Sequence, residues 1–216
     1  MSDHQVELPE PLARSPIPPA GPVRVEAGWE VSGARSGAAL TLTDFSPLAK
    51  VHVRAPGNGT FAKALGVPFG RAARDLGGLL IGSGPGEWLL LAPPGTAPEA
   101  AGRLTALAAD AAPDEFVSVI DLTHGRALVR VTGAAAADLL ARLCPVDLDG
   151  EVTPDGAALR SAVAGIATDV VRDDHGGTLS YLLHCERSSG RYLFGALLEA
   201  GEEFGIAVDG FTGPGV

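Results

Sequence analysis

The sequence predicts an α/β (α+β) fold made of two related strand-strand-helix units that form an open-faced sandwich. Short segments rich in Leu, Val and Ile, bounded by Gly, Pro or Asp, alternate with helix-forming segments that carry one apolar face. The same order of elements recurs in the second half of the 216 residues. An apolar helix face cannot remain in water, so the helices are expected to cover one face of an antiparallel or mixed sheet.

The expected strands are short and lie on both sides of each helix: Ala39–Leu42, Lys50–Arg54, Gly78–Ile81, Trp88–Ala92, Ser118–Asp121, Arg126–Thr132, Ala167–Arg172 and Leu179–Cys185. The expected helices are Gly59–Leu65, Ala97–Asp110, Ala134–Leu143 and Ser189–Phe204. Thr96 and Glu99 match a Thr-x-x-Glu capping box at the start of the second helix. Pro145 is expected to end the third.

The repeat keeps one register through several features. Trp88–Leu91 corresponds to Tyr181–His184 at a shift of 93 residues, and the same shift places Thr96 on Ser189. Earlier in each half, Asp44-Phe45-Ser46 recurs as Asp121-Leu122-Thr123 at a shift of about 76. The second half therefore carries roughly 17 extra residues, which fit a loop at Asp147–Ala164. This shared register predicts one duplicated domain over residues 36–209.

The two ends of the chain lie outside the repeat. Residues 1–35 are predicted to form a proline-rich extended arm, because six prolines up to Pro22 leave few amide donors and no apolar period. Such an arm is either a floppy tail or a segment that becomes ordered along a partner. Residues 210–216 are glycine-rich and are predicted to be a flexible tail.

Charge and composition indicate which partners to expect. The formal net charge of -10 argues against nucleic acid or an anionic membrane surface, since phosphate binding needs clustered Lys and Arg. No stretch approaches the roughly 20 apolar residues that span a bilayer, and the acidic, proline-containing start does not match a secretory signal. Cys144 and Cys185 are the only cysteines, which favours a reducing cytoplasm over a disulfide framework.

Known catalytic and metal-binding patterns do not occur. The five histidines show no metal-ligand spacing and there is no CxxC pair. Gly82–Gly86 precedes a strand, and Pro85 removes an amide, so this segment predicts a hairpin turn and not a phosphate loop. There is no Gly-x-Ser-x-Gly elbow. We therefore expect no catalytic, cofactor-binding or metal-binding residues in this chain.

One polar cluster lies between two apolar strands: Asp121, Thr123, His124 and Arg126. In one interpretation these residues face a ligand or a partner. In the other, Asp121 and Thr123 bond to local amides in a turn while Arg126 balances Asp121. The repeat favours the turn, because Asp44-Phe45-Ser46 occupies the corresponding position.

The same region resembles a known family. Ile120-Asp121-Leu122-Thr123-His124-Gly125-Arg126-Ala127, then Gly133, then Leu139–Asp149 with its Cys-Pro-x-Asp-Leu element, is similar to the gamma subunit of heterotetrameric sarcosine oxidase. Glu87–Leu91 also matches, and the similarity covers roughly residues 35 to 205. The resemblance implies the fold of the folate-binding domain of aminomethyltransferases. It also implies a non-catalytic, structural subunit that works with alpha, beta and delta chains.

By the same resemblance, FAD, FMN, NAD, tetrahydrofolate and zinc are expected in the partner subunits and no cofactor in this chain. The implied complex oxidatively demethylates sarcosine to glycine with tetrahydrofolate and O2. An alternative is a stand-alone folate-binding or aminomethyltransferase-like protein. The Lys-Gly-Cys-x-x-Gly-Gln-Glu stretch of some folate-binding relatives is absent, since residues 185–192 read Cys-Glu-Arg-Ser-Ser-Gly-Arg-Tyr. A third possibility is a subunit of a related N-methyl amine oxidase.

Overall fold

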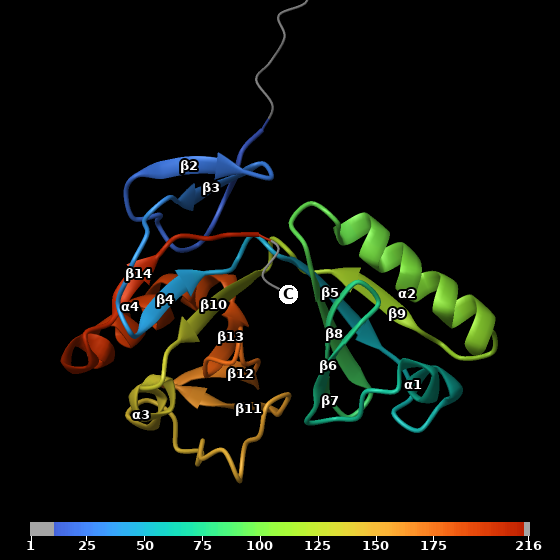
Figure 1. Ribbon diagram of the computed structural model, residues 1–216. Helices are drawn as coiled ribbons and strands as arrows, with labels where there is room; N and C mark the ends of the chain where they lie inside the picture. The colour runs from blue at the N-terminus through green and yellow to red at the C-terminus, as the bar shows by residue number, and fades with distance from the viewer. Residues whose placement is uncertain (1–10, 214–216) are drawn as a thin grey trace, which may run out of the picture.

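A computed structural model of the chain describes residues 11–213, and it places two β-sheets between two groups of helices (Figure 1). Residues 1–10 of the predicted arm and 214–216 of the predicted tail lie outside the described residues. The helices are α1 (Thr60–Leu65), α2 (Ala97–Ala111), α3 (Ala136–Ala141) and α4 (Gly190–Gly201), with short 3-10 turns at Arg187–Ser189 and Glu202–Phe204. None of the helices in the described range is long and apolar enough to cross a membrane.

The two main sheets have equivalent strand orders. The five-stranded sheet runs β6 (Ala72–Asp75), β7 (Gly78–Gly84), β8 (Glu87–Ala92), β5 (Ala49–Arg54) and β9 (Ser118–Asp121). The six-stranded sheet runs β11 (Ala158–Val163), β12 (Ile166–Arg172), β13 (Ser180–Glu186), β10 (Arg126–Thr132), β4 (Thr41–Asp44) and β14 (Ala207–Asp209). Every neighbouring pair in these two sheets is antiparallel except β14 with β4. The predicted duplication is therefore present in the strand order, with β14 added.

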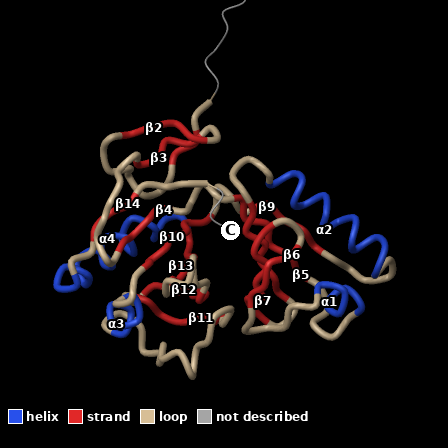
Figure 2. The backbone as a smooth tube through the Cα atoms, in the orientation of Figure 1, coloured by secondary structure: helices blue, strands red, loops and turns tan. Residues whose placement is uncertain are grey.

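Each sheet buries both faces. Along β10, Val129 and Val131 pack in the cluster that contains α3 and α4, whereas Leu128 belongs to the cluster between the sheets. This alternation follows the period of two in a strand, which sends successive side chains to opposite faces. Figure 2 shows the result as strands in the centre with helices outside them. Two open-faced sandwiches are thus confirmed, and their open faces pack against each other.

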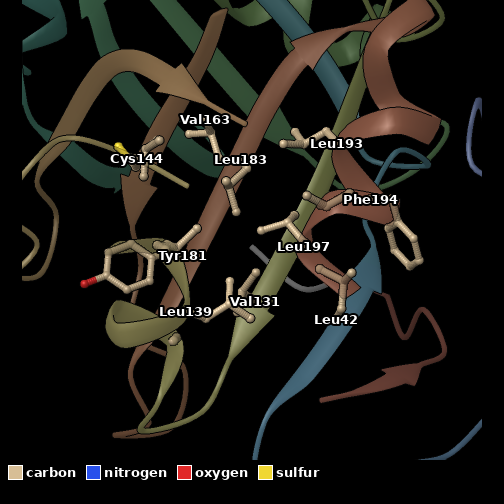
Figure 3. Packing of buried hydrophobic residues seen from close by; sticks show 14 of the residues in the cluster. Leu42, Val131, Leu139, Cys144, Val163, Tyr181, Leu183, Leu193, Phe194 and Leu197 are labelled. Carbon is tan, nitrogen blue, oxygen red and sulfur yellow. The ribbon is translucent and has the colours of Figure 1, made fainter. Parts of the chain in front are cut away.

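The helix-facing core of the six-stranded sheet is a continuous apolar layer (Figure 3). Leu193, Phe194 and Leu197 project from α4 toward the sheet and meet Leu42 and Leu183 there. The spacings of one, three and four positions along α4 place these side chains on one face of the helix. Burial of each such side chain contributes roughly 1.5–3 kcal/mol, so this layer fixes α4 on the sheet.

The first strand of each half lies in the other half's sheet. β4 pairs with β10 in the six-stranded sheet, and β9 pairs with β5 in the five-stranded sheet. The chain therefore changes sheets twice, at residues 45–48 (the first crossover) and at residues 122–125 (the second crossover). Neither half can complete its sheet without a strand from the other half. This exchange makes the two halves one domain.

The two crossovers use the same hydrogen bonds. In the first, Ser46 N donates to Asp44 Oδ1 (2.9 Å), and Ser46 Oγ accepts from Leu128 N (3.2 Å). In the second, Thr123 N donates to Asp121 Oδ1 (2.8 Å), and Thr123 Oγ1 accepts from Lys50 N (3.0 Å). The aspartate turns the chain and the hydroxyl fastens it to the first residues of the neighbouring strand.

Lys50 connects the two crossovers. Its side chain is fully buried, and its Nζ donates to the carbonyl oxygens of Ser46 (2.7 Å), Leu48 (2.9 Å) and Thr123 (3.3 Å). The residue equivalent to Lys50 in the second half is Leu128. The strand pairing shows this, because Val51 pairs with Leu90 in the same way as Val129 pairs with Leu183. Burial lowers the pKa of Lys50 to about 7, although Asp44 and Asp121 act in the opposite direction.

The extended arm predicted for residues 1–35 is wrong where the structure describes it. A three-stranded sheet forms from β1 (Ala13–Arg14), β3 (Trp29–Ser32) and β2 (Val23–Glu26). Trp29 and Val31 are 4% and 3% exposed and join the cluster between the main sheets. The prediction considered the prolines and overlooked these apolar residues. Their burial stabilises the segment against the rest of the domain.

Three smaller expectations also need correction. Thr96 does not cap α2: its Oγ1 donates to Pro93 O (2.8 Å), and its φ of -99° and ψ of 15° are not the extended backbone that a cap requires. The loop expected at Asp147–Ala164 becomes strand β11 from Ala158 onward. Within the predicted flexible tail, Phe211 is 1% exposed and its ring meets Phe45 edge to face at 5.3 Å.

Lys50→Met tests the buried lysine. Between pH of about 7 and about 10.5, Lys50 is protonated in the unfolded state and neutral in the folded state. The free energy of unfolding therefore rises with pH in this window, because the unfolded state binds more protons. We expect wild type to gain stability over Lys50→Met by up to about 1.4 kcal/mol per pH unit in this window. Urea unfolding at pH 6.5 and 9.0 measures it. Lys63→Met, at an exposed lysine of α1, controls for the loss of one charge. A stability difference that is the same at both pH values would contradict the expectation.

Candidate functional site

A cleft of about 270 Å³ opens between the two main sheets beside the second crossover. We call it the charged cleft, because ionisable side chains from both sheets line it: His52, Arg54 and Glu87 from the five-stranded sheet, and Arg126, Arg160, Asp169, His184 and Glu186 from the six-stranded sheet. Leu122 of the second crossover and Ser83 of β7 also contribute to its wall. The strand exchange therefore places residues from both halves around one space.

A row of polar side chains crosses the inner face of the six-stranded sheet. His184, Asp169 and Arg160 are direct neighbours on β13, β12 and β11. Asp169 Oδ2 lies 3.3 Å from His184 Nδ1, and Asp169 Oδ1 accepts from Arg160 Nε at 2.5 Å. Asp169 is thus held on both sides, which fixes the orientation of the imidazole ring.

This row reaches across to the other sheet. Arg160 Nη1 lies 3.6 Å from Glu87 Oε2, and Glu87 Oε1 accepts from Arg54 Nη2 at 2.5 Å. Arg126 forms a separate ion pair with Glu186 at the rim of the charged cleft. Arg160 therefore joins the two sheets through carboxylates on each of them.

Burial and hydrogen bonding set the protonation states here. Burial lowers the pKa of His184 below its ordinary value, and Asp169 opposes this only in part. The pKa of Asp169 is lowered even though burial acts to raise it, because the bonds from His184 and Arg160 outweigh the burial. An ionised Asp169 accepts the proton of Nδ1, so the neutral ring presents an unprotonated Nε2. In the described structure this buried Nε2 and the Oγ of Ser83 have no hydrogen-bond partner.

A second cavity, of about 410 Å³, occupies the equivalent position on the other side of the inter-sheet core. Phe45 and Arg130 line it where Leu122 and His52 line the charged cleft. Arg130 of this wall pairs with Asp173, whose Oδ2 lies 2.6 Å from Arg130 Nη2 and whose Oδ1 lies 2.8 Å from Nη2 of Arg74 on β6 of the other sheet. Each side of the inter-sheet core thus has an arginine from the outer strands of one sheet, Arg160 or Arg74, paired with a carboxylate of the other half, Glu87 or Asp173.

The structure gives different contacts to the four residues that the sequence grouped. Asp121 and Thr123 form the turn of the second crossover, as the turn interpretation expects. The His124 ring stacks on Trp29 with centroids 4.9 Å apart. Arg126 lines the charged cleft and pairs with Glu186, not with Asp121. Arg126 therefore lines the charged cleft, while a role of the other three in contacting a partner stays a prediction.

Sequence reasoning missed the row of His184, Asp169 and Arg160. One signal was present: at the shift of 93, His184 falls on Leu91, so one half has a polar side chain where the other has leucine. Among the described residues no group of three His, Cys, Asp or Glu is arranged to hold a metal ion. Burial also raises the pKa of Cys185 to about 11, which disfavours the thiolate that nucleophilic chemistry requires.

Residues 87–213 match the family model described as the GCVT N-terminal domain. The chain belongs to this family. Sarcosine oxidase subunit gamma of Corynebacterium sp. (strain P-1) is 33% identical over 137 residues, which are 59% of this chain and 64% of that protein. The chain thus spans a little under two thirds of that relative's length.

Two solved structures share the GCVT-type fold. One is heterotetrameric sarcosine oxidase from Corynebacterium sp. U-96 in complex with pyrrole 2-carboxylate, with a TM-score of 0.66 and 25% identity over 80% of this chain and 89% of that one. The other is glycine cleavage system aminomethyltransferase T from Bartonella henselae, with a TM-score of 0.64 and 19% identity over 87% of this chain and 55% of that one. The second supports the fold alone. The aminomethyltransferase-like fold and the resemblance to a sarcosine oxidase gamma subunit are thereby confirmed.

The imidazole of His184 is expected to titrate below the ordinary histidine pKa of about 6.5 in this GCVT-type domain. Asp169→Asn should lower it further, because the substitution removes the charge that favours the protonated ring. An NMR titration of the His184 ring resonances measures both effects. A rise in the pKa after Asp169→Asn would contradict this arrangement.

Asp173→Asn should destabilise the GCVT-type domain by about 3–5 kcal/mol, since it removes the carboxylate that pairs with the buried Arg130. The matched control is Glu30→Gln, which breaks the exposed pair with Arg14 and should cost no more than about 1 kcal/mol. Urea unfolding of both variants at neutral pH gives the comparison. Equal costs for the two variants would show that the inter-sheet pair does not carry this energy.

Proposed function

We propose that this chain is the gamma-type, non-catalytic subunit of a heterotetrameric sarcosine oxidase-type complex. The observation that supports this most strongly is the 33% identity to a sarcosine oxidase gamma subunit. The fold match extends over 89% of a chain of a heterotetrameric sarcosine oxidase. In this proposal the complex oxidatively demethylates sarcosine to glycine with tetrahydrofolate and O2, in the cytoplasm.

The redox cofactors FAD, FMN and NAD, with zinc and tetrahydrofolate, are assigned in this proposal to alpha, beta and delta partners. The charged cleft is a poor fit for a folate. Its volume of about 270 Å³ is below the roughly 300–1,000 Å³ that is usual for drug-sized ligands. Its wall is dominated by ion pairs, whereas a pterin ring favours apolar and aromatic contacts. We therefore derive no folate chemistry from this cleft.

An exposed apolar surface supports a role inside an assembly. Two adjoining grooves share Pro85 and Gly86 of the β7–β8 turn, and Phe69 lines one while Phe116 lines the other. Phe69 is 59% exposed and Phe116 is 84% exposed. Glu115 holds the loop before β9 in place by accepting from the amides of Thr60 and Phe61. Phe116 is thus presented to solvent by an anchored loop, as expected of a contact residue.

The repeat shows that the fold does not need these two rings. The position equivalent to Phe116 holds Ala39, because β9 and β4 are counterparts. The position equivalent to Phe69 holds Asp155, because residues 70–72 and 156–158 occupy corresponding places. The second half of the chain therefore forms the same elements with a small and a charged residue at these positions. The exposed rings are best explained by contact with another chain.

Co-expression of the tagged chain with candidate alpha, beta and delta chains tests the proposal. We expect a stable complex that carries flavin absorbance and oxidises sarcosine. The double variant Phe69→Asp and Phe116→Ala should lower recovery of the partners at least tenfold, because it removes about 1.5–3 kcal/mol of apolar burial per ring. Tyr192→Ala, an exposed aromatic of α4, is the control.

The alternatives give different results in the same preparation. Micromolar binding of tetrahydrofolate by the isolated chain would favour a stand-alone folate-binding or aminomethyltransferase-like protein. A complex that forms but oxidises another N-methyl amine in preference to sarcosine would indicate a related amine oxidase. A chain that remains monomeric and flavin-free beside its candidate partners would contradict the subunit role.

A further inference from the structure

We propose that the charged cleft binds a small zwitterionic amino acid. The cleft lies between the sheets, and its wall combines three arginines, three carboxylates and two histidines. The comparison of the two halves, the unpartnered buried atoms and the charge balance support this independently of one another.

The polar row is not required by the fold. In the repeat, His184 corresponds to Leu91 and Asp169 to Leu79, because Leu183 and Val170 correspond to Leu90 and Leu80. Leu91 and Leu79 are 0% and 3% exposed and belong to the inter-sheet core. The same chain therefore packs leucines at these positions in one sheet and an imidazole and a carboxylate in the other. Burying polar groups costs free energy that leucine avoids, so the polar pair indicates a role other than packing.

Two polar atoms at the cleft have no partner within the described structure: His184 Nε2 and Ser83 Oγ. Their residues both line the charged cleft, and the His184 side chain is 7% exposed. A buried polar atom without a hydrogen bond costs about 1–3 kcal/mol. A bound molecule with an N–H group would recover this energy, because the neutral ring with its proton on Nδ1 offers Nε2 as an acceptor.

The charges of the cleft select the ligand class. Arg54, Arg126 and Arg160 are balanced by Glu87, Asp169 and Glu186. The two histidines are neutral near pH 7, since burial lowers the pKa of both. A zwitterion preserves this balance, whereas a net anion or cation adds one unmatched charge. Its carboxylate suits an arginine of the rim, and its ammonium suits the carboxylates and His184 Nε2.

The size of the cleft limits the ligand further. A volume of about 270 Å³ holds about nine water molecules at roughly 30 Å³ each. This space suits a single amino acid. Arg126 and Glu186 lie at the rim with side chains 31% and 63% exposed, so they can rearrange around a ligand while Asp169 and His184 stay fixed.

Titration of the full chain with glycine, followed by isothermal calorimetry and by shifts of the His184 ring resonances, tests the inference. We expect saturable binding in the millimolar range. Acetate and methylammonium, which each carry one of the two charges, should bind at least tenfold more weakly. Failure of glycine to saturate the protein at concentrations up to about 100 mM would overturn the inference. Equal binding of acetate or methylammonium would also overturn it.

The double variant His184→Leu and Asp169→Leu copies the leucines of the other half. It should retain its thermal transition and lose glycine binding at least tenfold. Ser83→Ala is a milder variant that keeps the ion pairs, and it should weaken glycine binding severalfold even where the double variant does not fold. Thr43→Val, in the equivalent cavity on the other side, is the control and should bind glycine like wild type. Unchanged binding by the double variant or by Ser83→Ala would place glycine elsewhere. Glycine binding and assembly with partner chains are separate measurements, so failure of one leaves the other standing.

Discussion

The exchange of first strands between the two sheets is the constraint on which the rest of this structure depends. Because β4 completes the six-stranded sheet and β9 completes the five-stranded sheet, each half needs the other. The exchange requires two crossovers, and both are held by an aspartate turn and a hydroxyl that bonds to the neighbouring strand. It also brings the open faces of the sheets together, so helices remain on the outside only. The apolar inter-sheet core and the two flanking cavities follow from this geometry.

The two halves have diverged most where they face each other. On the helix-facing sides both halves use Val and Leu in equivalent strands, and both bury them fully. On the inner faces, Lys50 lies where the other half has Leu128, and His184 lies where the other half has Leu91. Packing against a helix accepts only apolar surface, whereas the ends of the inter-sheet layer reach solvent and can hold charge. The two halves therefore share one arrangement of strands and helices, and the residues that differ on their inner faces form the charged cleft.

Much of this fold follows from local patterns in the sequence. β9 and β10 match their predicted bounds, and the helices begin within two residues of the expected positions. The strands that were missed, such as β6 and β14, are short and partly exposed, so they lack the apolar alternation that marks a strand. The strand exchange itself could not be predicted, because β4 and β9 would fit either sheet by pattern alone. His184 and Asp169 were missed because they meet only through strand pairing. Asp121 and His124 are close in sequence, but in the structure they have different partners.

The most direct test of this account is native-state hydrogen exchange of the amides in β5 and β10, the central strands of the two sheets. If the exchanged strands join the halves into one unit, amides of both strands become exposed only on global unfolding and report the same free energy of opening. An opening free energy for either sheet that lies about 2 kcal/mol or more below that of the other would show that the halves unfold separately. That result would contradict the account.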